Sequence, residues 1–200
     1  MTSERDALRR ELRQRRRAIP AAQRIAAADA LAERLRALPF LPASGYAAGY
    51  WAMDGEIGLH NWQLRLPGGL IYCLPVLRAD NTLGFAPWHP GDALVTNRFG
   101  IPEPDVEPAS ALGPERMALV LMPLVGFDDE GHRLGMGGGW YDRSFGFRQR
   151  SAAPPWLVGV GFAAQRIEAL APAAWDVQVD AICTESQTLF PSRSSHGMPA

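Results

Sequence analysis

A glycine-rich segment in the second half of the chain carries the clearest chemistry. It reads RLGMGGGWYD from Arg133 to Asp142, with glycine at 135 and at 137–139. Glycine reaches backbone conformations closed to other residues and lets a ligand approach the main chain closely. The guanidinium of Arg133 suits phosphate oxygens, and the carboxylate of Asp142 suits a hard cation such as Mg²⁺. The segment therefore fits a magnesium-nucleotide site, although glycines alone would equally fit a surface loop without a ligand.

The residues on either side indicate how this segment is held. An apolar run, ALVLMPLVGF at 118–127, precedes it, and WYDRSF at 140–145 has the pattern of a helix. A strand, a glycine loop and a helix in this order place main-chain N–H groups beyond the carboxyl end of a strand, where α/β sheets bind ligands. Trp140 and Tyr141 fit stacking on a flat ring, but aromatic residues here are also typical of a core.

Composition excludes several other kinds of site. All 20 basic residues are arginine, so a Walker A lysine and a Schiff-base lysine are both impossible. A net charge of −1 gives no overall reason to expect nucleic acid, and no apolar run approaches the roughly 18 residues of a membrane span. Cys73 and Cys183 are too few for a disulfide framework, which favours free thiols in a reducing cytoplasm.

The elements that must position the segment alternate along the chain. Helices are expected over 3–17, with Ser3 as its cap, and from Pro20 to Leu38, with Ile25 and Leu35 on the buried side. Strands are expected at 46–51, 70–76, 117–123, 156–162 and 181–183, and short helices at 58–65, 140–150 and 164–170. The span 84–115 is expected to be irregular and the tail over 191–200 disordered. The pattern predicts one α/β domain over 1–190, layered and Rossmann-like, with a mostly parallel central sheet flanked by helices.

Longer stretches of the chain resemble a known family. The run GFDDEGHRLGMGGGWYDRSF at 126–145 resembles the signature of the 5-formyltetrahydrofolate cyclo-ligases. The resemblance extends to the N-terminal arginine helix, MDGEI at 53–57, FGIPEP at 99–104, VGVGFAAQRIEAL at 158–170 and WDVQVDAICT at 175–184. It implies ATP- and Mg²⁺-dependent closure of 5-formyltetrahydrofolate to 5,10-methenyltetrahydrofolate with release of ADP and phosphate. In this reaction ATP phosphorylates the formyl oxygen, the neighbouring amine attacks the formyl carbon, and phosphate departs.

The resemblance also implies roles for particular residues. Arg133 and Tyr141 would be catalytic, while Asp142 and Asp180 would hold Mg²⁺. The ATP-binding residues would be Arg5, Arg9, Arg133, Leu134, Gly135, Met136, Gly137, Gly138, Gly139, Trp140 and Tyr141. The folate-binding residues would be Arg9, Trp51, Glu56, Met136, Gly137, Gly138, Gly139 and Trp140. The partner would be the small-molecule folate, with neither nucleic acid nor membrane, and the protein would be a monomer in the cytoplasm.

Other interpretations of these residues stay open. The arginine stripe over 5–17 also fits a solvated helix face or an RNA-binding patch. Glu56 could be a surface acid or a helix cap, and Asp180 could cap or turn the chain before the last strand. Met136 and Gly138 are uncharged here, whereas some members of the family carry basic residues at these positions. The alternative functions are a sugar-phosphate isomerase-like enzyme and a non-catalytic paralogue that binds folate, nucleotide or RNA.

Overall fold

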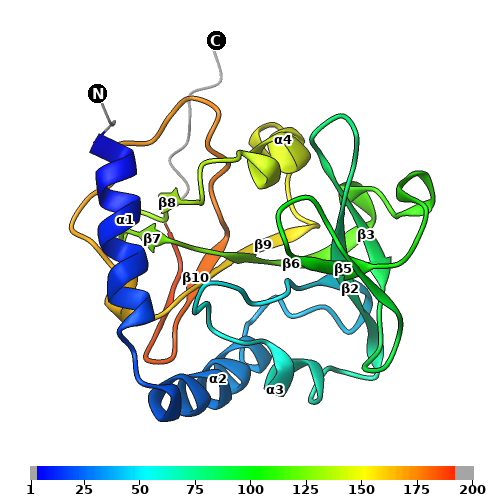
Figure 1. The fold of residues 1–200 in the computed structure, drawn as a ribbon, viewed down its shortest axis with the longest axis horizontal. Coiled ribbons are helices and arrows are strands. Elements are labelled where there is room, and N and C mark those ends of the chain that lie inside the picture. Colours follow the sequence, from blue (N-terminus) through cyan, green and yellow to red (C-terminus); the bar gives the residue numbers. More distant parts are fainter. Residues whose placement is uncertain (1–3, 192–200) are drawn as a thin grey trace.

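The structure, a computed structural model, describes residues 4–191 and is built around one twisted sheet (Figure 1). The seven strands lie in the order β11-β10-β9-β6-β1-β2-β3. They are β1 (Ser44–Ala48), β2 (Gly69–Leu77), β3 (Leu83–Pro87), β6 (Met117–Pro123), β9 (Trp156–Val160), β10 (Ala181–Cys183) and β11 (Thr188–Leu189). The five strands from β10 to β2 run parallel to their neighbours, whereas β3 and β11 pair antiparallel at the edges. This confirms the predicted α/β fold with a mostly parallel sheet.

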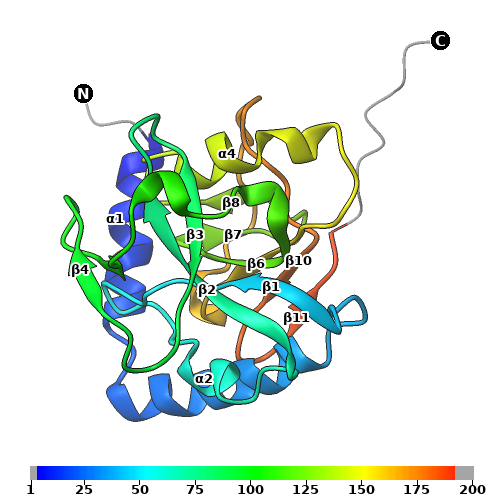
Figure 2. The same cartoon turned by 90° about the vertical axis from the view of Figure 1, so that its right-hand side faces the viewer.

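Four α-helices of the described chain surround this sheet, with at least one over each face. They are α1 (Glu4–Arg17), α2 (Ala21–Arg36), α3 (His60–Gln63) and α4 (Trp140–Phe145). In two views at right angles, α2 lies below the sheet and α4 above it (Figures 1 and 2). Leu31 and Leu35 of α2 are fully buried against the lower face, whereas Ile25 is 66% exposed, so its predicted burial is wrong. Ile25 lies in the second turn of α2, beyond the stripe that faces the sheet.

Helix α1 lies beside a small hairpin rather than on the main sheet. The hairpin pairs β7 (Gly126–Phe127) with β8 (Arg133–Leu134) in antiparallel fashion. Leu12 is buried in a cluster with Val125 and Leu134, and Leu8 packs against this cluster. Because the glycine segment starts directly after β8, this packing brings the arginines of α1 beside it.

Two predicted segments differ from the structure. The span 84–115 holds most of β3, a second hairpin of β4 (Leu94–Thr96) with β5 (Pro102–Pro104), and two 3-10 turns, so it is less irregular than expected. The segment 164–170 does not form the expected α-helix. The structure has a 3-10 turn at Ala163–Gln165 instead. The Gln165 side chain donates hydrogen bonds to the carbonyls of Leu124 and Val125, at 2.6 and 2.9 Å, which ties the turn to the end of β6.

Several remaining expectations concern single residues. Cys73 and Cys183 are buried free thiols, as predicted. Among residues 4–191 no helix combines the length and the apolar character needed to cross a membrane. The predicted cap at Ser3 and the tail from 192 onward lie outside the described residues.

Candidate active site

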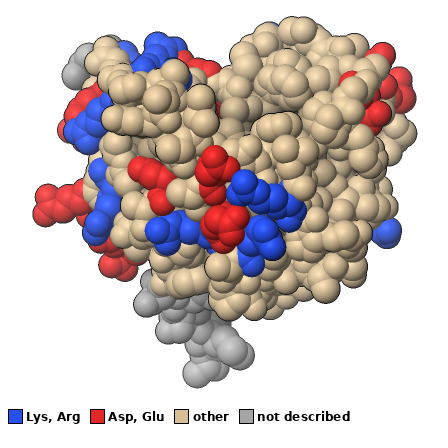
Figure 3. All heavy atoms as spheres, turned by 90° about the horizontal axis from the view of Figure 1, so that it is seen from below, with Lys and Arg blue, Asp and Glu red and all other residues tan. Residues whose placement is uncertain are grey.

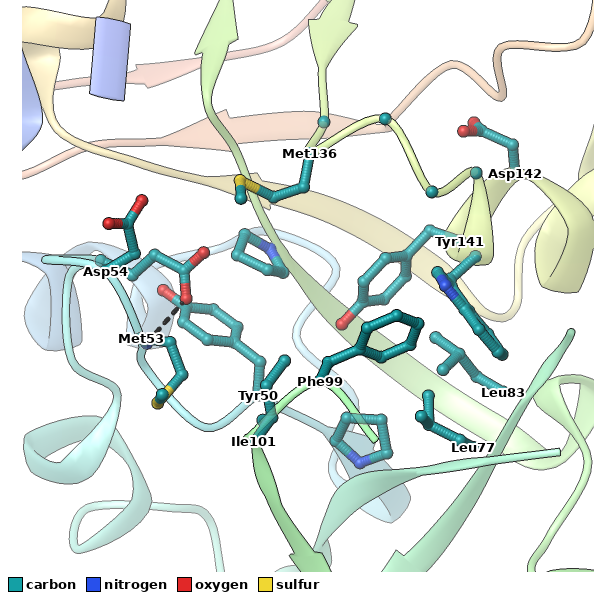
Figure 4. Close-up of a pocket in the computed structure, with 18 of the residues that line it drawn as sticks. Tyr50, Met53, Asp54, Leu77, Leu83, Phe99, Ile101, Met136, Tyr141 and Asp142 are labelled. Atoms are coloured by element: carbon teal, nitrogen blue, oxygen red, sulfur yellow. Dashed lines mark hydrogen bonds between the residues drawn. The ribbon is translucent and has the colours of Figure 1, made fainter. Parts of the chain in front are cut away.

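A cavity of about 440 Å³ opens where three parallel strands end (Figure 4). Tyr50 follows β1, Leu77 ends β2 and Pro123 ends β6, and all three residues line the cavity. Ligands of open α/β sheets bind at this edge, because the strands end there and the following loops diverge. The position therefore agrees with the one that the sequence predicts for the glycine segment.

The glycine segment forms one wall of this cavity. Gly137 has a φ of +98° and Gly139 a φ of +64°, conformations that other residues rarely adopt. Arg9 of α1 donates a hydrogen bond from Nε to the carbonyl of Gly135 at 2.9 Å. A Cβ on Gly137 would lie 3.4 Å from Cζ of Arg9, so the loop and the guanidinium approach each other closely. The segment therefore needs glycine at 137 and 139 for its backbone conformation.

Arg133 and Asp142 meet across the two ends of the segment. The Arg133 side chain is only 6% exposed and donates from Nη2 to Oδ1 of Asp142. The same oxygen accepts the main-chain N–H of Val177 at 3.1 Å. The buried Nε of Arg133 has no hydrogen-bond partner among residues 4–191. An unpaired buried donor is costly, by about 1–3 kcal/mol, so this N–H would be satisfied by a ligand with an oxygen acceptor.

Aromatic side chains close one end of the cavity. Figure 4 shows Tyr141 and Phe99 side by side there, with Tyr50, Met53 and Asp54 at the other end. Trp140 packs edge-on against Phe99, with ring centroids 5.8 Å apart. Burial raises the pKa of Tyr141 well above its usual range, so its phenol stays protonated. The apolar walls and neutral phenols suit a flat, uncharged ring system.

The opposite end carries an acidic residue. Glu56 lines the cavity, and its Oε2 accepts the main-chain N–H of Met53 at 3.0 Å. Burial raises the pKa of Glu56, while the Met53 hydrogen bond and the charge of Arg16 act in the opposite direction. Trp51 lines the same end and packs edge-on against Trp88 at 5.8 Å. A partly desolvated carboxylate here would bind N–H donors of a ligand strongly.

The structure brings together all but two of the predicted site residues. Those that line the cavity are Arg5, Arg9, Trp51, Glu56, Arg133, Gly135, Met136, Gly137, Gly138, Gly139, Trp140, Tyr141 and Asp142. Leu134 is buried in the cluster under α1 instead, because its side chain points away from the cavity side of β8.

Asp180 is also absent from the cavity wall. Its side chain is 4% exposed, and both of its oxygens accept from Nη2 of Arg148 at 3.0 Å. Its Oδ2 also accepts the main-chain N–H of Leu157 at 2.8 Å. Nor do residues 4–191 contain a group of three or more Asp, Glu, His or Cys that could hold a metal ion. Asp142 thus lies at the cavity, whereas Asp180 is buried away from it in an ion pair with Arg148.

The sequence alone missed several residues of the cavity. Phe99 and Ile101 come from the span expected to be irregular, and the β4–β5 hairpin carries them to the site. Trp175 is 69% exposed and lines both this cavity and a shallower hollow behind the glycine segment. The FGIPEP and WDVQVD stretches contain these residues and were the signal that could have located them.

Known proteins share this sequence pattern and this fold. The model of the 5-formyltetrahydrofolate cyclo-ligase family matches residues 1–185. The 5-formyltetrahydrofolate cyclo-ligase of Escherichia coli K12 is 36% identical over 181 residues, covering 88% of this chain and 97% of that protein. The enzyme of the same name from Haemophilus influenzae is 32% identical over 180 residues, covering 88% and 95%. The NMR structure of Aquifex aeolicus 5,10-methenyltetrahydrofolate synthetase matches with a TM-score of 0.78 and 27% identity, covering 99% of this chain and 97% of that one. The chain therefore belongs to the 5-formyltetrahydrofolate cyclo-ligase family.

Proposed function

We propose that this protein closes 5-formyltetrahydrofolate to 5,10-methenyltetrahydrofolate with ATP, in the cavity at the carboxyl ends of β1, β2 and β6. Membership of the family supports the folate substrate and the use of ATP. The observation that carries the placement is Arg133, whose buried Nε lacks an acceptor within the described chain while the residue lines the cavity. That N–H suits an oxygen of a phosphate or of the formyl group.

The chemistry requires positioning and neutralisation of charge more than a protein nucleophile. A formamide oxygen is a poor leaving group, and the phosphoryl group from ATP makes it a good one. Arg133 and the main-chain N–H groups of the glycine segment stabilise the negative charge on the transferred group. Arg5 and Arg9 neutralise the remaining phosphates from the side of α1, where both line the cavity.

The folate is held from the other side. The Glu56 carboxylate accepts hydrogen bonds from N–H groups on the edge of the pterin, and Trp51 packs beside the ring. Tyr141 acts as a neutral hydrogen-bond donor to the reacting oxygen, since burial raises its pKa well above the working range. These contacts hold the amine nitrogen and the formyl carbon in place for attack.

Mg²⁺ would enter this site through Asp142. Arg133 and the main-chain N–H of Val177 both donate to Oδ1 of this carboxylate. One carboxylate together with phosphate oxygens and water is a usual environment for Mg²⁺. Asp180 would have to leave Arg148 to become a ligand, so the fit is weaker there. If Asp142 binds the cation, Asp142→Asn shifts the Mg²⁺ concentration needed for half-maximal activity upward. An unchanged Mg²⁺ titration would contradict this role.

We also propose that residues 1–190 act as one domain and that the protein is a cytoplasmic monomer without a nucleic-acid partner. The cavity wall combines residues from α1 to Asp176 of the same chain. The arginines of α1 are largely paired with acids, as Arg5 is with Asp176 at 3.0 Å and Arg13 with Asp54 at 2.7 Å. On the face seen in Figure 3, arginine and acidic side chains also alternate. A patch for RNA would instead present unpaired positive charge.

The test is an assay with the protein, ATP, Mg²⁺ and 5-formyltetrahydrofolate. The expected result is the near-ultraviolet absorbance of the methenyl product, with one ADP formed per turnover and no product when ATP is omitted. A folded protein that yields no product and binds RNA in a salt-sensitive manner would support the non-catalytic alternative instead. The isomerase-like alternative needs neither ATP nor metal, so a folded protein that releases no ADP in response to 5-formyltetrahydrofolate would favour it.

A further inference from the structure

Asp54 makes an unusual set of contacts at the wall of the cavity. Its φ of +53° lies in the left-handed region, where a residue other than glycine is uncommon. Its Oδ2 accepts from Nε of Arg13 at 2.7 Å and from Nη2 of Arg16 at 2.8 Å, and its Oδ1 pairs with Arg17. Burial acts to raise the pKa of Asp54, but the hydrogen bonds from Arg13 and Arg17 and the charge of Arg16 together lower it. One carboxylate thus joins three arginines on the last turns of α1.

Arg16 is the buried member of this group. Its side chain has no exposed surface, and its Nε donates to the carbonyl of Asp54 at 3.1 Å. Its Nη1 donates to the carbonyl of Leu124 at 3.3 Å and lies 3.5 Å from Oε1 of Glu56. A fully buried guanidinium is stable only where its donors are met by acceptors, and here a carboxylate and two carbonyls meet them. Arg16 therefore joins α1, the loop after β1 and the end of β6.

This cluster touches the two ends of the proposed site. Glu56 is two residues from Asp54 on the same loop and lines the folate end of the cavity. Helix α1 carries Arg5 and Arg9, which line the same cavity and are assigned to the phosphates of ATP. Among residues 4–191, Glu56 contacts the Met53 N–H and Arg16. The orientation of Glu56 and the position of α1 thus depend on the same buried contacts.

We propose that Asp54 and Arg16 are positioning residues that fix Glu56 at the cavity wall and hold α1, with Arg5 and Arg9, against the site. The proposal rests on the assignment of Glu56 to folate and of Arg5 and Arg9 to ATP. It makes the two substrate sites depend on one ion-pair cluster, in which Asp54 lies at the cavity wall and Arg16 is fully buried behind it. Loss of the cluster therefore weakens both sites together.

The charges of the cluster give a second consequence. The groups that act on Glu56 are Asp54 on its own loop and Arg13 and Arg16 on α1, with burial as the largest influence on its pKa. The phenols of Tyr50 and Tyr141 face it in neutral form, since burial raises the pKa of both. Removing Asp54 takes away a negative neighbour and lowers the pKa of Glu56. Removing Arg16 takes away a positive neighbour and raises it. The pH dependence of folate binding therefore reports the charges of the cluster, while the loss of affinity for both ligands reports its positioning role.

The experiment measures equilibrium binding of 5-formyltetrahydrofolate without ATP, and of a non-hydrolysable ATP analogue with Mg²⁺, by calorimetry. Asp54→Asn is expected to weaken both by about tenfold or more, as displacement of positioned groups does. The matched control is Glu11→Gln, which removes the exposed Glu11–Arg15 pair of the same helix and is expected to leave both affinities unchanged. Folate affinity falls at low pH as Glu56 becomes protonated. The pH of this fall is expected to be lower in Asp54→Asn and higher in Arg16→Met than in the wild type.

Each outcome decides the proposal. A folded Asp54→Asn protein that binds either ligand as the wild type does would overturn it, as would a fall in folate affinity whose pH moves the same way in both variants. If Asp54→Asn does not fold, Arg13→Gln removes one half-buried arm of the cluster and decides in its place, with unchanged affinities overturning the proposal. Glu56→Gln separates the assignment of Glu56 to folate from the positioning role of Asp54 and Arg16. Wild-type folate binding in that variant would refute the folate assignment itself. Weakened binding in Glu56→Gln but not in Asp54→Asn would refute only the positioning role.

Discussion

Substitution of Gly137 by alanine tests the role of the glycine segment most directly. The residue has a φ of +98°, so an alanine there is strained by about 1–3 kcal/mol. Its Cβ would lie 3.4 Å from Cζ of Arg9, a close but ordinary van der Waals contact, so the backbone conformation is the main source of the strain. The variant loop relaxes when it is empty and must return to the strained conformation when it binds phosphates. The KM for ATP is therefore expected to rise by roughly five- to 150-fold, since about 1.4 kcal/mol corresponds to tenfold.

Gly135→Ala is the matched control within the same segment. Gly135 has no positive φ, and the nearest atom to an added Cβ is Nη1 of Arg133 at an ordinary 3.9 Å. The assay follows the methenyl product at varied ATP, with thermal unfolding of both variants to verify that they fold. The reasoning is refuted if Gly137→Ala and Gly135→Ala give the same KM for ATP within about twofold, because strain at 137 would then have no part in binding.

Three further substitutions test neighbouring residues. Arg133→Ala is expected to lower kcat/KM for ATP by about a hundredfold or more, and wild-type kinetics would remove it from the site. Tyr141→Phe should lower kcat by about tenfold, because the reacting oxygen loses a hydrogen-bond donor. The pH–rate profile between about pH 6 and pH 9 should keep its shape, because burial keeps the phenol protonated in the wild type. If the variant instead lost an ionisation step from this profile, the donor role of Tyr141 would be contradicted. Asp180→Asn deprives the buried Arg148 of its charged partner, so urea unfolding should show a loss of about 3 kcal/mol, equal with and without Mg²⁺. A variant as stable as the wild type would refute this structural role.

The differences between sequence and structure share a physical cause. The span 84–115 looked irregular because its strands are short and proline-rich, and only pairing of Leu94–Thr96 with Pro102–Pro104 makes them strands. The segment 164–170 looked helical, yet the side chain of Gln165 binds carbonyls about 40 residues earlier in the chain. In both cases contacts remote in sequence override the local preference, and single-sequence patterns do not contain them.

By itself, the sequence determined which groups are available and how the backbone runs locally. The absence of lysine, the glycines at 135 and 137–139 and the aromatic pair that begins α4 are local facts, and they predicted a glycine-walled anion site with arginine and carboxylate at its ends. Only the tertiary structure decided which partner each charge has. Asp180 turned toward Arg148, Asp142 toward Arg133, and Asp54 toward three arginines of α1, because burial leaves a charge stable only beside acceptors or donors that the fold brings from elsewhere in the chain.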